Sequence, residues 1–129
     1  MSSKAAWLMT VAGLVVVASG TTYLAAAAGA GAPKGYVIAE LTVTDPEGYK
    51  QYAAAVPPII AKFGGKYLVR GGQTVGVEGD PPGGRIVVIE FDSLAAARSF
   101  EDSQEYQATA ELRHKAARGR VFLAEGIVN

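Results

Sequence analysis

Two runs of β-branched and aromatic residues constrain the fold more than any other feature of the sequence. "GYVIAELTVT" covers residues 35–44 and "RIVVIEF" covers residues 85–91. Each run predicts a β-strand, and each is apolar at odd and even positions alike. Because alternate residues of a strand face opposite sides of a sheet, both faces of these strands require cover from other parts of the assembly.

The sequence predicts a helix between these runs, over about residues 45–63. Asp45 is a good capping residue, and Pro46 suits the first helical position. Apolar side chains then recur at three- and four-residue steps, which gives the helix one apolar face. Pro57 and Pro58 interrupt this pattern, because a proline removes a helix hydrogen bond and crowds the preceding turn. We therefore expect a kink or a break there, with a second helical segment beginning near Pro58.

The rest of the domain reads as a hairpin, a helical region in two pieces and a last strand. The hairpin joins "KYLVRGGQTVGVEG" to "RIVVIEF" through "DPPGG". Asp92 or Ser93 caps the first helical piece and Ser103 caps the second. "GRVFLAEGIV" is the last strand. The order βαββαβ predicts an α+β fold with one four-stranded antiparallel sheet and its helices on one face.

A sheet with helices on one side exposes its other face. Here that face carries Tyr36, Ile38 and their neighbours on the adjacent strands. An exposed apolar surface of this size usually marks an interface. Since a second copy packed sheet to sheet would bury it, we expect a homodimer that forms through the sheet face.

The sequence of residues 1–32 is typical of a targeting segment followed by a linker of small residues. Lys4 precedes residues 5–28, which carry no charge, and small residues near Ala28 fit a cleavage site. This pattern is typical of a signal peptide. An uncleaved membrane anchor is the alternative, because the uncharged stretch is long enough to span a bilayer. Either way, residues 33–129 form an exported domain, periplasmic or extracellular, whose only membrane contact is through the N-terminal segment.

The composition argues against several classes of function. The chain has no cysteine, one histidine, and 12 basic against 12 acidic residues. Without cysteine there is no disulfide framework, thiolate metal site or cysteine nucleophile. The lone His114, among basic neighbours, suits neither zinc nor haem, so we expect no metal and no cofactor. The balanced charge offers no patch for nucleic acid.

The glycine-rich stretch after Arg70 does not match a phosphate-binding loop. Gly71 and Gly76 have the right separation, but Val77-Glu78 stands where Lys-Ser/Thr is required, and no helix follows. The glycines instead permit a β-bulge or a close backbone approach. Arg70 is then either an exposed or ion-paired strand residue, or a guanidinium that lines a cleft and offers a bidentate fork to a carboxylate.

Four motifs follow one another along the domain: "TDPEGYKQY", "GGKYLVRGG", "VVIEF" followed by Ser-x-x-x-A, and "SQEYQ". With these motifs in this order, residues 35–128 closely resemble the domain-of-unknown-function 1330 family. The resemblance implies a ferredoxin-like monomer of the dimeric α/β-barrel superfamily, in agreement with the predicted fold and dimer. Members of this superfamily include monooxygenases and isomerase-like enzymes, but a shared fold alone does not transfer an activity.

The motif positions supply the candidate site residues. Arg70 and Glu90, on adjacent strands, would pair at a cleft, with Arg70 as carboxylate anchor and Glu90 as general base. Glu40 is a second candidate base, and Ser103 and Tyr106 are candidate ligand contacts. Each residue also has a structural alternative. Arg70 and Glu90 are then a structural ion pair or two solvated charges, and Glu40 lies at the rim of the dimer. Ser103 is then a helix cap, and Tyr106 is part of the core wall.

Three functions fit these residues. The first is binding of a small acidic or aromatic metabolite in a cleft between sheet and helices, with Arg70 as anchor. The second is a cofactor-independent enzyme, of monooxygenase or isomerase type, with Glu90 or Glu40 as base. The third is a structural dimer or interaction module without a ligand site. The sequence does not decide whether the protein is an enzyme.

Overall fold

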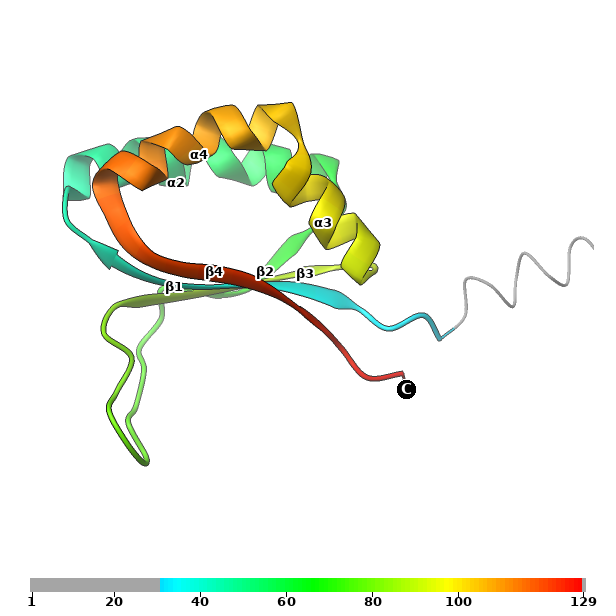
Figure 1. Ribbon diagram of the computed structural model, residues 1–129, viewed down its shortest axis with the longest axis horizontal. Coiled ribbons are helices and arrows are strands. Elements are labelled where there is room, and N and C mark those ends of the chain that lie inside the picture. The colour runs from blue at the N-terminus through cyan, green and yellow to red at the C-terminus, as the bar shows by residue number, and fades with distance from the viewer. Residues whose placement is uncertain (1–30, 129) are drawn as a thin grey trace, which may run out of the picture. The chain divides into compact units, whose positions relative to one another are not determined.

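A computed structural model describes residues 31–128 of the chain, in which one compact unit begins at Pro33. Its elements are β1 (Gly35–Val43), α2 (Pro46–Lys62), β2 (Lys66–Arg70), β3 (Arg85–Phe91), α3 (Leu94–Asp102), α4 (Gln104–Ala116) and β4 (Ala117–Glu125). The strands form one antiparallel sheet in the order β2-β3-β1-β4. The helices α2, α3 and α4 lie on one face of it (Figure 1). The predicted element order and one-sided helix layer are confirmed.

The targeting segment expected over residues 1–32 lies almost entirely outside the described residues, which begin at Gly31. A cleaved signal peptide, a membrane anchor, and the export that follows from either stay predictions. Between residues 31 and 128, the structure contains no helix with the length and apolar character needed to cross a membrane.

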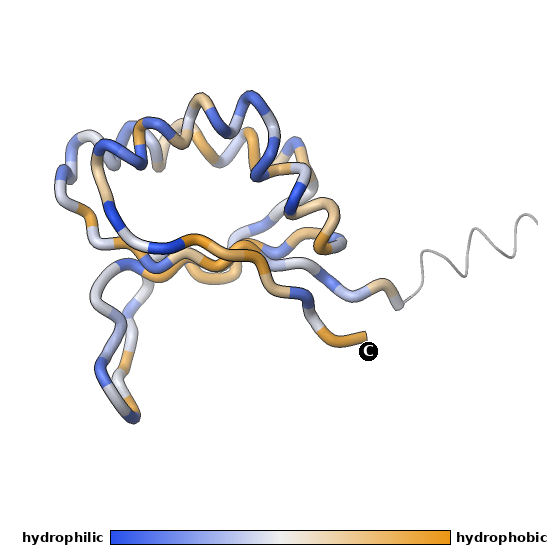
Figure 2. Tube along the Cα trace, viewed as in Figure 1, coloured by the Kyte–Doolittle hydropathy of each residue, from blue (hydrophilic) through white to orange (hydrophobic). Residues whose placement is uncertain are grey.

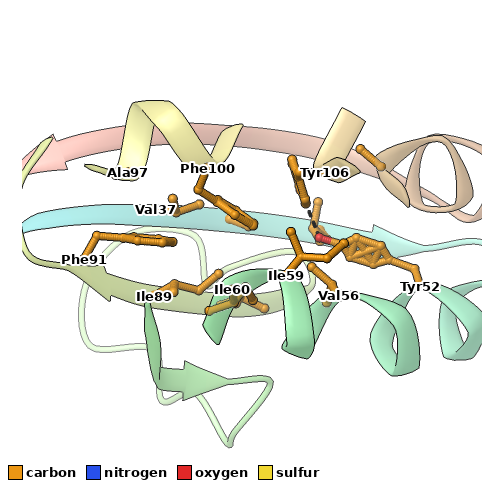
Figure 3. Packing of buried hydrophobic residues seen from close by; sticks show 14 of the residues in the cluster. Val37, Tyr52, Val56, Ile59, Ile60, Ile89, Phe91, Ala97, Phe100 and Tyr106 are labelled. Atoms are coloured by element: carbon orange, nitrogen blue, oxygen red, sulfur yellow. Dashed lines mark hydrogen bonds between the residues drawn. The ribbon is translucent and has the colours of Figure 1, made fainter. Parts of the chain in front are cut away.

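The core lies between the helices and the inner face of the sheet, which is the face they cover. Val37 of β1 and Ile89 of β3 are buried there, as the two-residue alternation of a strand requires. Aromatic rings close one end of this core (Figure 3). Phe100 stacks on Phe91 at 5.2 Å between ring centroids, and Tyr106 lies 4.3 Å from Phe100.

Helix α2 runs unbroken through Pro57 and Pro58, so the expectation of a second helical segment was wrong. A proline at position 57 has no N–H to offer the carbonyl of Ala53, four residues earlier. The guanidinium of Arg70, on β2, supplies the missing hydrogen bond: its Nη2 donates to the Ala53 carbonyl oxygen at 3.0 Å. A side chain from the sheet thus satisfies a backbone group that the proline leaves free.

The second strand is shorter than the sequence suggested. β2 ends at Arg70, and residues 71–84 form an exposed connection that projects away from the sheet on the side opposite the helices (Figure 1). The glycines therefore begin this connection instead of bending a strand. A β-bulge is present, but it lies at Leu68, where the pairing with β3 shifts between Tyr67 and Val69.

The second helical region is in two pieces, as predicted, because two serines end and restart it. Ser93 caps α3 by accepting a hydrogen bond from the backbone N–H of Ala96 at 3.0 Å. Ser103 caps α4 by accepting from the backbone N–H of Tyr106 at 3.1 Å. Each cap satisfies a donor that the first helical turn leaves unpaired.

We predict that Arg70 stabilises the fold less when Pro57 is replaced. In the natural sequence, Arg70→Met removes the hydrogen bond to Ala53, which should lower the free energy of unfolding by about 1 kcal/mol. In Pro57→Ala, the restored N–H bonds to Ala53 instead, so Arg70→Met should cost less. Urea unfolding of the two single variants and the double variant measures this coupling. Equal costs in both backgrounds would contradict it.

Candidate functional site

A cavity lies between the inner face of the sheet and helices α2 and α4. About 30 Å³ of it admits water-sized atoms, and its empty space including the open mouth is about 480 Å³. Aliphatic side chains form the floor: Val37, Ala39, Leu41, Val87, Ile89 and Val121.

The strand register arranges this floor as rows across the sheet. Arg70 of β2 pairs with Val87 of β3, and Val87 pairs with Ala39 of β1. Ala39 pairs in turn with Val121 of β4. Because paired residues point to the same side of a sheet, this row carries one arginine and then three small or medium apolar side chains. Arg85, two residues before Val87, points to the same side.

The bulge at Leu68 decides which face Arg70 occupies. Lys66 pairs with Glu90, and the regular two-residue alternation would leave Arg70 on that same face. The extra residue of the bulge reverses the alternation, since two residues of one strand then oppose one of the other. Arg70 therefore pairs with Val87 and points into the cavity.

Three arginines line the cavity, namely Arg70, Arg85 and Arg113, and no carboxylate is among its lining residues. The guanidinium of Arg70 lies 4.5 Å from the ring centroid of Tyr67. Nη2 of Arg85 donates to the backbone carbonyl of Arg70 at 3.4 Å. The Nε atoms of Arg85 and Arg113 are buried, and neither has a hydrogen-bond partner among the described residues. Such donors call for an acceptor, because buried polar groups are nearly always hydrogen-bonded.

Gly71 makes room for Arg85. Its φ of 67° lies in the left-handed region, which glycine adopts without strain. A side chain at this position would also collide with the guanidinium of Arg85. The glycine that follows Arg70 thus serves a close approach between side chain and backbone at the mouth of the cavity, which is one of the two roles the sequence predicted for these glycines.

Two buried tyrosines form the polar part of the opposite wall. The hydroxyls of Tyr52 and Tyr106 lie 3.0 Å apart (Figure 3). Burial raises the pKa of both phenols, so both stay protonated at neutral pH. Only one of their two protons lies between the two oxygens, which leaves the other free to donate. The guanidinium of Arg113 lies 5.8 Å from the ring centroid of Tyr52.

Arg113 interacts electrostatically with a carboxylate, that of Glu101. Burial lowers the pKa of Arg113, but its contacts with Tyr106 and Tyr52 outweigh this and raise the pKa overall, so the guanidinium stays charged. Burial raises the pKa of Glu101, and the charge of Arg113 opposes this shift. Glu101 also lines a second hollow at the β4 edge, together with Val121.

Of the residues proposed from sequence as ligand contacts, two line the cavity: Arg70 and Tyr106. Ser103 does not. Its Oγ donates to the carbonyl of Phe100 at 2.8 Å and accepts from the N–H of Tyr106, so it holds the junction between α3 and α4. Ser103 therefore affects the cavity only indirectly: it fixes where α4 begins, and α4 carries Tyr106.

The two candidate bases lie on the outer face of the sheet. Glu90 forms an ion pair with Lys66 at 3.3 Å, and Glu40 forms one with Arg120 at 3.3 Å. The expected pair of Arg70 with Glu90 was wrong, because the bulge puts their side chains on opposite faces. Neither carboxylate is among the residues that line the cavity.

Residues 31–128 contain no group of three or more histidine, cysteine, aspartate or glutamate residues that could hold a metal ion. His114 is exposed on α4, and its Nδ1 lies 3.2 Å from Glu111. It is not one of the residues that line the cavity.

Sequence reasoning missed Arg85, Arg113 and Tyr52. The spacing along the chain could have revealed Arg113. It follows the candidate Tyr106 by seven residues, which is two helical turns, so both lie on the same side of α4. Arg85 is the first residue of β3, and its side chain lies on the same face of the sheet as that of Val87, two residues later. Tyr52 lies in the apolar stripe of α2, which reads as core unless the partner of its hydroxyl is known.

The sheet order and the βαββαβ connection define a ferredoxin-like α+β protein. Within that class, the family model of the domain of unknown function DUF1330 matches residues 34–127, and the chain belongs to this family. The resemblance noted in the sequence is thus confirmed. No curated protein matches the chain.

Solved structures share the fold at low identity. The RPA0582 protein of unknown function from Rhodopseudomonas palustris is 18% identical with a TM-score of 0.54, covering 77% of this chain and 85% of its own. A dimeric ferredoxin-like protein of unknown function from Thermobifida fusca is 15% identical with a TM-score of 0.51, covering 77% and 94%. At such identities, the likeness extends to the fold alone.

We predict that the free energy of unfolding falls as the pH rises above about 10. The unfolded chain releases its phenolic protons near pH 10, whereas the folded chain retains those of Tyr52 and Tyr106, whose pKa values are raised. Each proton that only the folded chain retains lowers the free energy of unfolding by about 1.4 kcal/mol for each unit of pH above this point. Urea unfolding between pH 9 and pH 11 measures this slope.

Tyr52→Phe should make that decline shallower, because it removes one of the retained protons. Tyr36→Phe is the control, since Tyr36 lies on the outer face, where its hydroxyl donates to Glu90 at 3.4 Å. Equal slopes for the natural protein and Tyr52→Phe would contradict the retention of this proton.

Proposed function

We propose that the protein is a binding module that takes up the carboxylate of a small molecule in the cavity between sheet and helices. The observation that carries this proposal is the pair of buried Nε donors, on Arg85 and Arg113, that lack a partner among the described residues. They belong to a cavity lined by a further arginine and by no carboxylate. A buried N–H donor without an acceptor is costly, and a ligand carboxylate supplies acceptors together with a counter-charge for the arginines that have no carboxylate among the lining residues.

Arg70 and Arg85 are the proposed anchor. A backbone carbonyl holds each of them, that of Ala53 at 3.0 Å from Arg70 and that of Arg70 at 3.4 Å from Arg85. These bonds restrict each guanidinium before a ligand arrives, which lowers the entropy cost of binding. Each guanidinium retains further donors, since it carries five N–H groups.

The remaining lining favours an acid with an apolar or aromatic body. Tyr49, Tyr67 and Phe100 contribute rings, and the floor is aliphatic. Because only about 30 Å³ now admits water-sized atoms, a ligand has to displace side chains on entry. Among the lining residues, Arg70 is exposed and four larger side chains are half-buried, so these can move toward solvent: Tyr49, Tyr67, Arg85 and Arg113.

Binding is better supported than catalysis by either carboxylate named from the sequence. A general base has to come within hydrogen-bond reach of the proton it removes. Glu90 and Glu40 lie across the sheet from the cavity, in ion pairs with Lys66 and Arg120. A reaction that used them would need a second site on the outer face.

We predict that benzoate stabilises the full-length protein through this cavity. A ligand at about a hundred times its dissociation constant adds about 2.7 kcal/mol to the free energy of unfolding, a readable shift in thermal unfolding. Arg70→Met and Arg85→Met should each weaken the response. Arg118→Met is the matched control, because Arg118 is an exposed arginine of β4. Sodium chloride at equal ionic strength controls for the effect of salt.

A response of the same size in all four proteins would contradict binding at this cavity. A folded natural protein that shows no response to benzoate or to other small carboxylates would instead favour the interaction module without a ligand site.

We also propose that two copies pack together through the outer face of the sheet. Within the described residues, no helix covers this face (Figure 1), and hydrophobic residues run along its strands (Figure 2). By register its apolar side chains are Tyr36, Ile38, Val69, Ile86, Val88 and Phe122. Phe122 is 44% exposed. The dimeric description of the Thermobifida fusca protein is in line with such a pairing.

We predict that Val88→Asp turns a dimer into a monomer in analytical ultracentrifugation at micromolar concentration. Val88 stands on the second strand of the face, so a carboxylate there would lose its hydration on pairing without gaining a counter-charge. Ala108→Asp, at an exposed position of α4, should leave the dimer intact. A monomeric natural protein, or a dimeric Val88→Asp, would rule out this interface.

A further inference from the structure

The cavity has two polar ends that differ in charge. Arg70 and Arg85 stand at its β2 and β3 side, and the lining offers no carboxylate to balance them. Arg113 stands at the other side, where α4 covers the sheet. Glu101 interacts with Arg113 there. Glu101 also lines the second hollow, at the β4 edge, together with Val121. The β2 and β3 end is therefore cationic, while at the other end the charge of Arg113 is opposed by that of Glu101.

Both ends donate hydrogen bonds. The β2 and β3 end presents the free N–H groups of Arg70 and the buried Nε of Arg85. The far end presents the buried Nε of Arg113 and the hydroxyl proton that the pair of Tyr52 and Tyr106 leaves free. Every one of these groups calls for an acceptor in the ligand. The charge balance favours an anionic acceptor at the first end and a neutral one at the second.

Apolar side chains and aromatic rings line the middle of the cavity. Val87 and Ala39 form its floor, and the rings of Tyr49 and Tyr52, 5.6 Å apart, lie on the helix side. The guanidinium of Arg85 lies 5.5 Å from the ring centroid of Tyr49, and that of Arg113 lies 5.8 Å from the ring centroid of Tyr52, so each end of the cavity has a guanidinium beside one of these two rings. A single ring with substituents at opposite positions suits such a slot, since it can lie between the sheet and the tyrosines.

We propose that the cavity selects a ring-bearing carboxylate whose ring carries a neutral oxygen, a hydroxyl or a carbonyl, at the position opposite the carboxylate. The carboxylate binds Arg70 and Arg85, and the neutral oxygen accepts from Arg113 and from the tyrosine pair. This inference rests on the proposed function and names the ligand class of the same site.

The test compares the affinities of three probes for the full-length protein by isothermal titration calorimetry at pH 7: benzoate, 4-hydroxybenzoate and terephthalate. The phenol of 4-hydroxybenzoate is neutral at this pH. The added oxygen should tighten binding about tenfold over benzoate, as expected for one well-placed hydrogen bond. Terephthalate, with a second carboxylate beside Glu101, should bind more weakly than 4-hydroxybenzoate.

Two variants test which end of the cavity binds the neutral oxygen of the ligand. Tyr52→Phe and Arg113→Met should each reduce the preference for 4-hydroxybenzoate over benzoate to less than about twofold. Tyr36→Phe is the matched control, because it removes a hydroxyl from the outer face of the sheet and should keep the full preference. Using two variants keeps the test decisive if one of them fails to fold.

The outcomes separate this inference from the proposed function. Benzoate binding without any gain from the hydroxyl overturns the two-ended site, as does a gain that persists in Tyr52→Phe and Arg113→Met. Terephthalate binding more tightly than 4-hydroxybenzoate overturns the neutral far end. If none of the three probes binds, the proposed function falls together with the inference.

Discussion

One β-bulge determines the chemistry of this domain. At Leu68 the edge strand β2 gains a residue relative to β3, and the alternation of its side chains reverses. Without it, Arg70 would share the outer face with Glu90, and the cavity would lose an arginine. The rest of the register is held by the core, because a one-residue slip of β1 or β3 would expose side chains such as Leu41 and Phe91. Each of these contributes about 1.5–3 kcal/mol through burial.

The inward position of Arg70 also links the sheet to helix α2. β2 pairs only with β3, so it is an edge strand with few contacts of its own. The hydrogen bond from Arg70 to Ala53 joins this edge to the helix above it. It does so at the one carbonyl that Pro57 deprives of its usual donor. The same guanidinium therefore supports the helix and faces the cavity, which couples the stability of this edge to the geometry of the site.

Local sequence chemistry predicted the elements and their order, whereas long-range pairing decided the site. Ser93 and Ser103 end and begin helices through bonds to residues three positions away, so their role could be read from the sequence. The continuity of α2 could not, because it depends on an arginine from another strand. The face of Arg70 depends on a bulge that no glycine marks. The pairing of Arg70 with Glu90 failed for that reason, although each residue was correctly placed on its strand.

The sheet separates the charges of the domain, and this separation is the strongest argument that the cavity has a ligand. Overall the chain is formally neutral. On the outer face, the strand carboxylates Glu40 and Glu90 are neutralised by Arg120 and Lys66. On the inner face, arginines line a cavity without a carboxylate among its walls. Arg70 has a structural role in its bond to Ala53, but the buried Nε of Arg85 has no partner among the described residues, and apolar side chains of similar volume would serve a core without that cost. Unpaired buried donors are a cost that proteins carry at functional sites, and the proposed ligand would supply their missing partner.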